Sequence, residues 1–107
     1  MSGIEADFRV APNHPSLRGH FPGQPIVPGV LLLDEVIGIA EQATGRIVAG
    51  VRDVKFMLAL RPDEEAHVRC EVDSKQVSFL VSALRDRATL TVATGKLLLE
   101  PGDRPIA

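Results

Sequence analysis

The residues best suited to chemistry lie in the segment that runs from Gly19 to Asp34. His20 stands among closely spaced prolines and glycines, and Asp34 follows it on a stretch with helical patterning. An imidazole titrates near neutral pH, so His20 can accept a proton under physiological conditions. The apolar neighbours of Asp34 predict a buried carboxyl group, and burial favours the uncharged form that can donate a proton. These residue types are suited to general acid–base chemistry.

A proline-rich loop must position His20. Five of the eight prolines fall within residues 12–28, and each fixes its own φ and favours extended geometry in the residue before it. The segment therefore predicts a stiff, irregular loop. Long irregular loops in compact domains are usually functional or disordered, and the apolar residues Phe21, Ile26 and Val27 favour a packed, functional loop.

A helix must position Asp34. Pro28 and Gly29 suit a helix start, the apolar pattern continues to Ala43, and Gly45 is a natural stop. The first three turns are apolar on nearly every side, which predicts a helix enclosed by the rest of the protein.

After Gly45 the apolar pattern changes to a period of two, which indicates strands. Strands are expected over residues 46–60, 65–73, 76–84 and 88–100, with turns at 61–63, 74–75 and 85–87. A short first strand is expected to begin at residues 8–10, and Gly95 is expected to mark a bulge.

This order of elements predicts an α+β fold in one domain, residues 1–107. Consecutive strands joined by short turns predict a meandering antiparallel sheet. A single helix that is apolar nearly all round requires the sheet to curl around it, which is the hotdog arrangement. One such unit leaves a sheet edge open, so we expect dimerisation into a double hotdog.

Composition excludes several classes of function. The net charge is −2, and the chain has no Tyr or Trp and no Lys/Arg cluster, which argues against nucleic-acid binding. The twelve scattered basic residues can form a patch only through the fold, and such a patch could steer an acidic partner. The one cysteine, Cys70, is expected to be buried and inert. No signal peptide and no membrane-length apolar run is visible, which indicates a cytoplasmic protein.

The loop sequence from Gly19 to Gly29 resembles the signature of bacterial β-hydroxyacyl-acyl-carrier-protein dehydratases of the non-isomerising type. Every fixed position of the pattern Gly-His-Phe-Pro-Gly-x-Pro-x-x-Pro-Gly is matched. His14-Pro15 and the later stretch over residues 54–62 are also similar to the family. The short chain resembles the compact dehydratase-like proteins of polyketide and aryl-polyene pathways.

The resemblance implies that His20 and Asp34 are the catalytic residues and that they meet across the dimer interface. It implies removal of water from 3-hydroxyacyl thioesters on an acyl carrier protein, which gives trans-2-enoyl thioesters. The amide of Gly29 would polarise the thioester carbonyl, with Phe21 and Pro28 as further substrate-binding residues. Neither a metal ion nor a cofactor is expected.

Each site residue also has a structural interpretation. His20 could be an ordinary loop histidine, and Asp34 could be an acid stabilised by the helix dipole. Glu35 is adjacent and is the alternative acid. His14 is expected to be structural and His67 to be solvated, and the three histidines lack the spacing of metal ligands.

One departure from the family bears on the site. A glutamine typically lies one helical turn after the carboxylate, and here that position is Gly38, with Gln42 one turn further. The water network and the acyl tunnel are therefore expected to differ.

Two other functions remain open at this point. One is a hotdog thioesterase, against which the histidine loop argues, and the other is a non-catalytic acyl-binding subunit, which Gly38 favours. The expected partners are an acyl carrier protein and a second copy in a homodimer or higher oligomer, or another hotdog subunit in a hetero-oligomer. Neither nucleic acid nor a membrane is expected as a partner.

Overall fold

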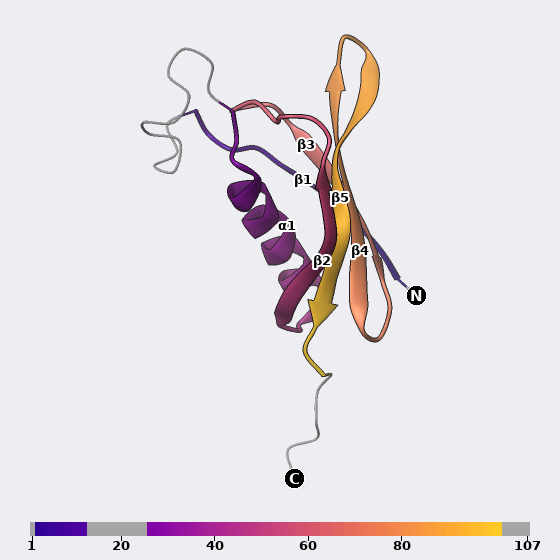
Figure 1. The fold of residues 1–107 in the computed structure, drawn as a ribbon. Coiled ribbons are helices and arrows are strands. Elements are labelled where there is room, and N and C mark those ends of the chain that lie inside the picture. The colour runs from indigo at the N-terminus through magenta and orange to yellow at the C-terminus, as the bar shows by residue number, and fades with distance from the viewer. Residues whose placement is uncertain (1, 13–25, 102–107) are drawn as a thin grey trace.

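The computed structural model describes residues 2–12 and 26–101, in which one helix packs against one face of a five-stranded antiparallel sheet (Figure 1). The predicted proline loop lies mostly outside the described residues. The elements in chain order are β1 (Ser2–Phe8), α1 (Gly29–Thr44), β2 (Val48–Phe56), β3 (Ala66–Val72), β4 (Gln76–Arg85) and β5 (Ala88–Leu99).

The strand order across the sheet is β1-β3-β4-β5-β2, so β1 and β2 form its two edges. Strands β3, β4 and β5 form the predicted meander, with turns where the sequence places them. Strand β2, however, pairs with β5 and not with β3, so the prediction of consecutive neighbours is wrong for this strand. Residues 57–65 join β2 to β3 and are longer than hairpin loops of roughly two to five residues, so they can cross the end of the sheet.

The ends of α1 confirm the predicted helix signals. Pro28 is the N-cap residue, and Gly45 ends the helix with φ 71°, a left-handed conformation that suits glycine. The N–H of Gly45 donates to the carbonyl oxygen of Glu41 at 2.8 Å, which satisfies an otherwise open carbonyl at the helix end.

The helix is covered on one side only. Its buried residues face the sheet and are Leu31, Leu32, Val36 and Ala40. Spaced one turn apart along another side are four exposed residues, Val30, Asp34, Gly38 and Gln42. The prediction of an enclosed helix is therefore wrong for the described chain, because the sheet covers one face and leaves Val30 73% exposed.

Strand β1 begins earlier than predicted, at Ser2, and ends at Phe8. Its register with β3 places Ile4, Ala6 and Phe8 opposite buried β3 residues, and Glu5 and Asp7 on the outer face of the sheet. Apolar and acidic residues therefore alternate along β1, as expected for a strand with one buried face. The prediction that the strand begins at residues 8–10 is wrong.

Strand β2 carries the irregularity that was expected at Gly95. Arg52 pairs with Lys96 and Lys55 pairs with Thr94, so β2 has one more residue than β5 over this stretch. The bulge therefore lies in β2, at Asp53 with φ 54°, and Gly95 lies opposite it. A β-carbon on Gly95 would come 2.8 Å from Cζ of Phe79, so close packing is the reason for this glycine.

The core lies between α1 and the inner face of the sheet. Val36 of the helix and Val68, Val81 and Leu97 of the strands are fully buried. Cys70 of β3 is also fully buried, as predicted. Truncation of a buried leucine such as Leu97 to alanine typically lowers stability by about 2–5 kcal/mol, so this layer holds the helix in place.

Candidate active site

The start of α1 forms one wall of the candidate site. The carbonyl oxygen of Pro28 accepts hydrogen bonds from the N–H groups of Leu31 and Leu32, at 3.0 and 3.1 Å. Among the described residues, the preceding N–H groups of Gly29 and Val30 have no such backbone acceptor, and the first turn contains no acidic side chain. These amides lie at the positive end of the helix dipole and can donate to an oxygen that develops negative charge.

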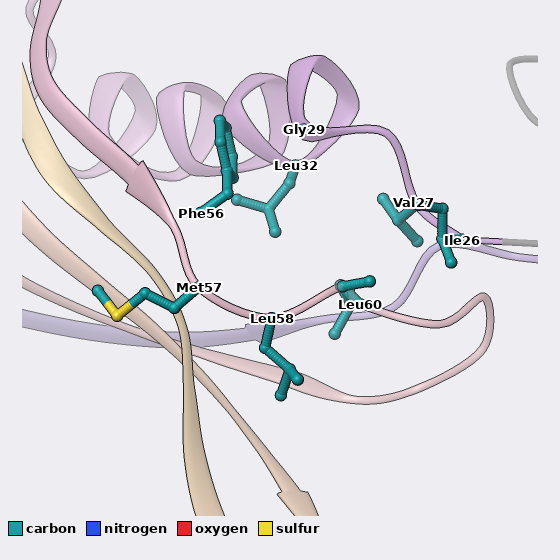
Figure 2. A pocket seen from close by; sticks show the side chains of 9 residues that line it. Ile26, Val27, Gly29, Leu32, Phe56, Met57, Leu58 and Leu60 are labelled. Atoms are coloured by element: carbon teal, nitrogen blue, oxygen red, sulfur yellow. The ribbon is translucent and has the colours of Figure 1, made fainter.

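An apolar cavity of about 450 Å³ opens beside this helix start (Figure 2). The N–H of Val27 donates to the carbonyl oxygen of Leu60 at 2.8 Å, which ties the segment before the helix to the β2–β3 connection. The cavity is lined by Ile26, Val27, Gly29, Leu32, Phe56, Met57, Leu58, Ala59 and Leu60. A pocket with an apolar lining and a few backbone donors suits an acyl chain that ends in a polar head.

Phe56, the last residue of β2, covers the helix start. Figure 2 shows its ring extending towards the first turn of α1, beside Gly29 and Leu32, while Met57 points away from the helix. A β-carbon on residue 29 would lie 2.8 Å from Cζ and 3.0 Å from Cε1 of Phe56. Glycine at position 29 therefore permits the close approach of the ring.

Asp34 lies on the exposed side of α1, with Val30 one turn before it and Gly38 one turn after it. The described chain alone therefore does not bury this carboxyl group, contrary to the prediction from its apolar neighbours. Neither Asp34 nor the half-buried Glu35 has a side-chain hydrogen bond or ion pair to another described residue.

The other predicted site residues divide into two groups. Gly29 lines the apolar cavity, whereas its neighbour Pro28 is half-buried at the helix start and is not one of the lining residues. His20, Phe21 and His14 lie outside the described residues, so the pairing of His20 with Asp34 stays a prediction.

A histidine site that the sequence analysis missed lies on the outer face of the sheet, away from the cavity. His67 of β3 contacts two carboxylates of β1: Nδ1 lies 2.6 Å from Oδ1 of Asp7, and Nε2 lies 2.8 Å from Oε1 of Glu5. The Asp7 contact, followed by that of Glu5, raises the pKa of His67 above its ordinary value. The prediction that His67 is merely solvated is therefore wrong. The sequence analysis missed the contact because it depends on the register between β1 and β3.

Two further features of the described residues bear on the site. No group of three or more His, Cys, Asp or Glu side chains in this part of the chain is arranged to hold a metal ion. Of the helices within residues 2–12 and 26–101, none has the length and apolar character needed to cross a membrane.

The chain is similar in sequence to known dehydratases. A family model described as ApeI-like, ApeI dehydratase, matches residues 1–96. The 3-hydroxyacyl-[acyl-carrier-protein] dehydratase FabZ of Lawsonia intracellularis is 33% identical over 81 residues, which cover 64% of this chain and 53% of that protein. The matched part of this chain spans roughly half to three-fifths of the length of the FabZ relatives.

Two solved structures are similar over nearly the whole chain. An uncharacterized protein from Erwinia carotovora superposes with a TM-score of 0.80 at 28% identity, over 92% of this chain and 83% of that chain. A chain of the dehydratase heterocomplex ApeI:P from Xenorhabdus doucetiae superposes with a TM-score of 0.75 at 28% identity, over 91% and 86% of the two chains. Because the family model covers most of the sequence, the chain belongs to the ApeI-like dehydratase family.

Proposed function

We propose that this protein removes water from 3-hydroxyacyl thioesters carried on an acyl carrier protein and releases trans-2-enoyl thioesters, in fatty-acid or polyene/polyketide-type biosynthesis. The observation that carries this proposal is the apolar cavity that opens at the α1 N-terminus, where the amides of Gly29 and Val30 have no backbone acceptor among the described residues. The cavity suits the acyl chain, and the amide of Gly29 suits the thioester oxygen.

The reaction needs a base, an acid and an oxyanion donor. His20 removes a proton from C2, and negative charge develops on the thioester oxygen, where the N–H of Gly29 donates a hydrogen bond. The C3–O bond then breaks, and Asp34 gives a proton to the departing hydroxyl, which leaves as water. Phe21 and Pro28 help to hold the acyl chain and the loop. The same groups in reverse roles hydrate the product, so the reaction is reversible.

A second subunit completes this site. Asp34 is exposed on the open side of α1. Among the described residues, β2 has a neighbouring strand on one side only, and it carries the exposed residues Val51 and Phe56. Pairing of two copies along β2 would bury these residues and bring the His20 loop of one copy to Asp34 of the other. The partner is a second copy of this chain or another hotdog subunit, in a dimer or a larger assembly.

A direct assay tests the proposal. A 3-hydroxyacyl thioester on carrier protein is incubated with the wild type, His20→Ala and Asp34→Asn, and loss of water is followed by mass spectrometry. Each substitution is expected to lower the rate by about 10²–10⁴-fold. Asp34→Glu and Glu35→Gln are the matched controls, because the first keeps the acid and the second removes the alternative one.

The assay separates the three candidate functions. Enoyl product that is lost in both variants supports the dehydratase. Release of free thiol without enoyl product supports a thioesterase instead. Binding of acyl carrier protein with neither product, over a range of acyl chains, supports a non-catalytic acyl-binding subunit.

A further inference from the structure

A pair of like charges lies directly across two strands on the outer face of the sheet. Arg52 of β2 is the register partner of Lys96 of β5. Like charges at directly opposed positions destabilise a sheet, so this pairing contributes nothing favourable to folding. The Arg52 side chain is 54% exposed, and solvent screening keeps the cost small.

The bulge in β2 adds a third cation to the same face. Arg52 and Lys55 are three residues apart, and in a regular strand they would point to opposite faces. Their partners Lys96 and Thr94 are two residues apart, so the extra residue at Asp53 turns Lys55 to the side of Arg52. Asp53 has a left-handed φ of 54°, which aspartate tolerates better than most residues with a side chain. We call Arg52, Lys55 and Lys96 the basic face.

The basic face borders a shallow hollow of about 430 Å³. The charged residues that line it are Lys55, Lys96 and one carboxylate, Asp53, and the hydroxyl-bearing residues are Ser78 and Thr94. The hollow therefore offers hydrogen-bond donors and two cations against one anion. Two carboxylates lie near these three cations, so positive charge is in excess. Oδ2 of Asp53 lies 3.5 Å from Nε of Arg52, and Glu71 pairs with Ser78 one strand further on. Among the described residues, Lys55 and Lys96 form no ion pair.

We propose that the basic face is the surface on which an acidic carrier protein docks. This inference rests on the proposed function, which requires a protein-borne substrate. The whole chain carries a net charge of −2, so an acidic partner is repelled in general and needs a local positive surface to approach in one orientation. Pairing of two copies along β2 uses backbone groups in the plane of the sheet and leaves this outer face uncovered.

The location is compatible with delivery of a thioester to the cavity. Lys55 of the basic face is followed by Phe56, whose ring lies against Gly29 on the opposite side of the sheet. A carrier on the basic face is therefore close to the end of β2 that borders the cavity, where the thioester that it carries can enter.

The test compares two double variants that remove the same charge. Lys55→Gln/Lys96→Gln neutralises the basic face, and Arg61→Gln/Arg87→Gln neutralises two cations outside it. Each is assayed with 3-hydroxyoctanoyl thioesters of acyl carrier protein, coenzyme A and N-acetylcysteamine. We expect the first variant to raise KM for the carrier-bound substrate about tenfold at low salt, with little change at high salt. We expect its kcat/KM for N-acetylcysteamine thioester, and both parameters of the control variant, to match the wild type.

Other outcomes overturn the proposal. An equal rise in KM for the coenzyme A thioester identifies a phosphate site in place of a protein-docking surface. An unchanged KM for the carrier-bound substrate, or an equal rise in the control variant, rejects the basic face. If the wild type converts none of the three thioesters, the proposed function fails. The Kd of labelled acyl carrier protein, measured by fluorescence anisotropy, then decides the docking surface separately, because a Kd that is the same in both variants rejects it.

Discussion

The ring of Phe56 lies against the backbone of Gly29, so that a β-carbon on residue 29 would meet Cζ of that ring at 2.8 Å. This contact joins the end of β2 to the first turn of α1, where the cavity opens. Gly29 and Phe56 are far apart in the sequence, yet the ring of Phe56 leaves no room for a side chain at position 29.

Gly29→Ala is therefore expected to lower stability by about 1–3 kcal/mol, because the added methyl group overpacks this contact. Chemical denaturation measures the change. The matched background is Phe56→Ala, in which the ring is absent and Gly29→Ala should have little effect or a slightly favourable one. An equal loss of stability in both backgrounds would show that the ring is not the cause.

Gly38→Ala is expected to raise stability by roughly 0.5–1 kcal/mol, because alanine favours helix and a β-carbon at this exposed position meets no atom within 4 Å. The matched control is Gly45→Ala, which should lower stability because Gly45 has φ 71°. Thermal melts of the two variants should shift in opposite directions. A melt that falls for Gly38→Ala would indicate that another subunit packs against the bare backbone there.

The contacts of His67 predict a dependence of stability on pH. Asp7 and Glu5 raise the pKa of His67, and Glu65 and Asp7 line the shallow pocket beside it. A raised pKa means that the stabilisation is complete below about pH 6.5, the value for an unfolded histidine, and is lost as pH rises through the folded pKa. The difference in melting temperature between the wild type and His67→Gln should follow this course.

An NMR titration of the His67 ring measures the pKa directly. The contribution to stability is expected to be small, because the side chain is 43% exposed and solvent screens its charge. A pKa at or below 6.5 would contradict the prediction. Loss of the raised pKa in Asp7→Asn, more than in Glu5→Gln, would identify the stronger contact.

The ion pair between Glu64 and Arg85 predicts sensitivity to acid. Nε and Nη2 of Arg85 lie 2.5 and 2.6 Å from the two carboxylate oxygens of Glu64, and Nη2 also donates to the carbonyl oxygen of Ala59 at 2.6 Å. These contacts tie the β2–β3 connection to the end of β4. The hydrogen bond from Arg85, opposed in part by burial, lowers the pKa of Glu64.

A lowered pKa means that this stabilisation is present above the unfolded value, about 4.3, and is lost as pH falls through the folded value. Glu64→Gln should lower stability by about 1–3 kcal/mol at neutral pH, since both side chains are only 14% exposed. The loss should shrink towards pH 3. Arg85→Lys keeps the positive charge but loses the bidentate contact, so its stability should lie between that of the wild type and that of Glu64→Gln. A loss that is independent of pH would point to packing alone.

Local signals predicted much of the fold. The Pro28–Gly29 start and the Gly45 stop place α1, and alternation locates β3, β4 and β5, because these features depend on residues close together in the sequence. Pairing of β2 with β5 and the contact of His67 with β1 were not predicted, because both require knowledge of which strands are neighbours. The exposure of Asp34 was missed because apolar neighbours in sequence do not show which side of a helix the sheet covers.

The candidate site was predicted in part. The spacing of prolines and glycines pointed to the helix start, and the cavity lies there. The role of Phe56 could not be seen from the sequence, because its contact with Gly29 depends on how far β2 extends before the chain turns away.

The burial of Cys70 gives the protein a built-in reporter of opening. Its thiol is fully buried in β3, and burial raises its pKa, so both access and ionisation slow its reaction with alkylating or disulfide reagents. Because Cys70 is the one cysteine in the chain, modification at a single site is read directly from the mass of the intact protein. The rate of labelling then follows the fraction of molecules whose core is transiently open, without any introduced probe.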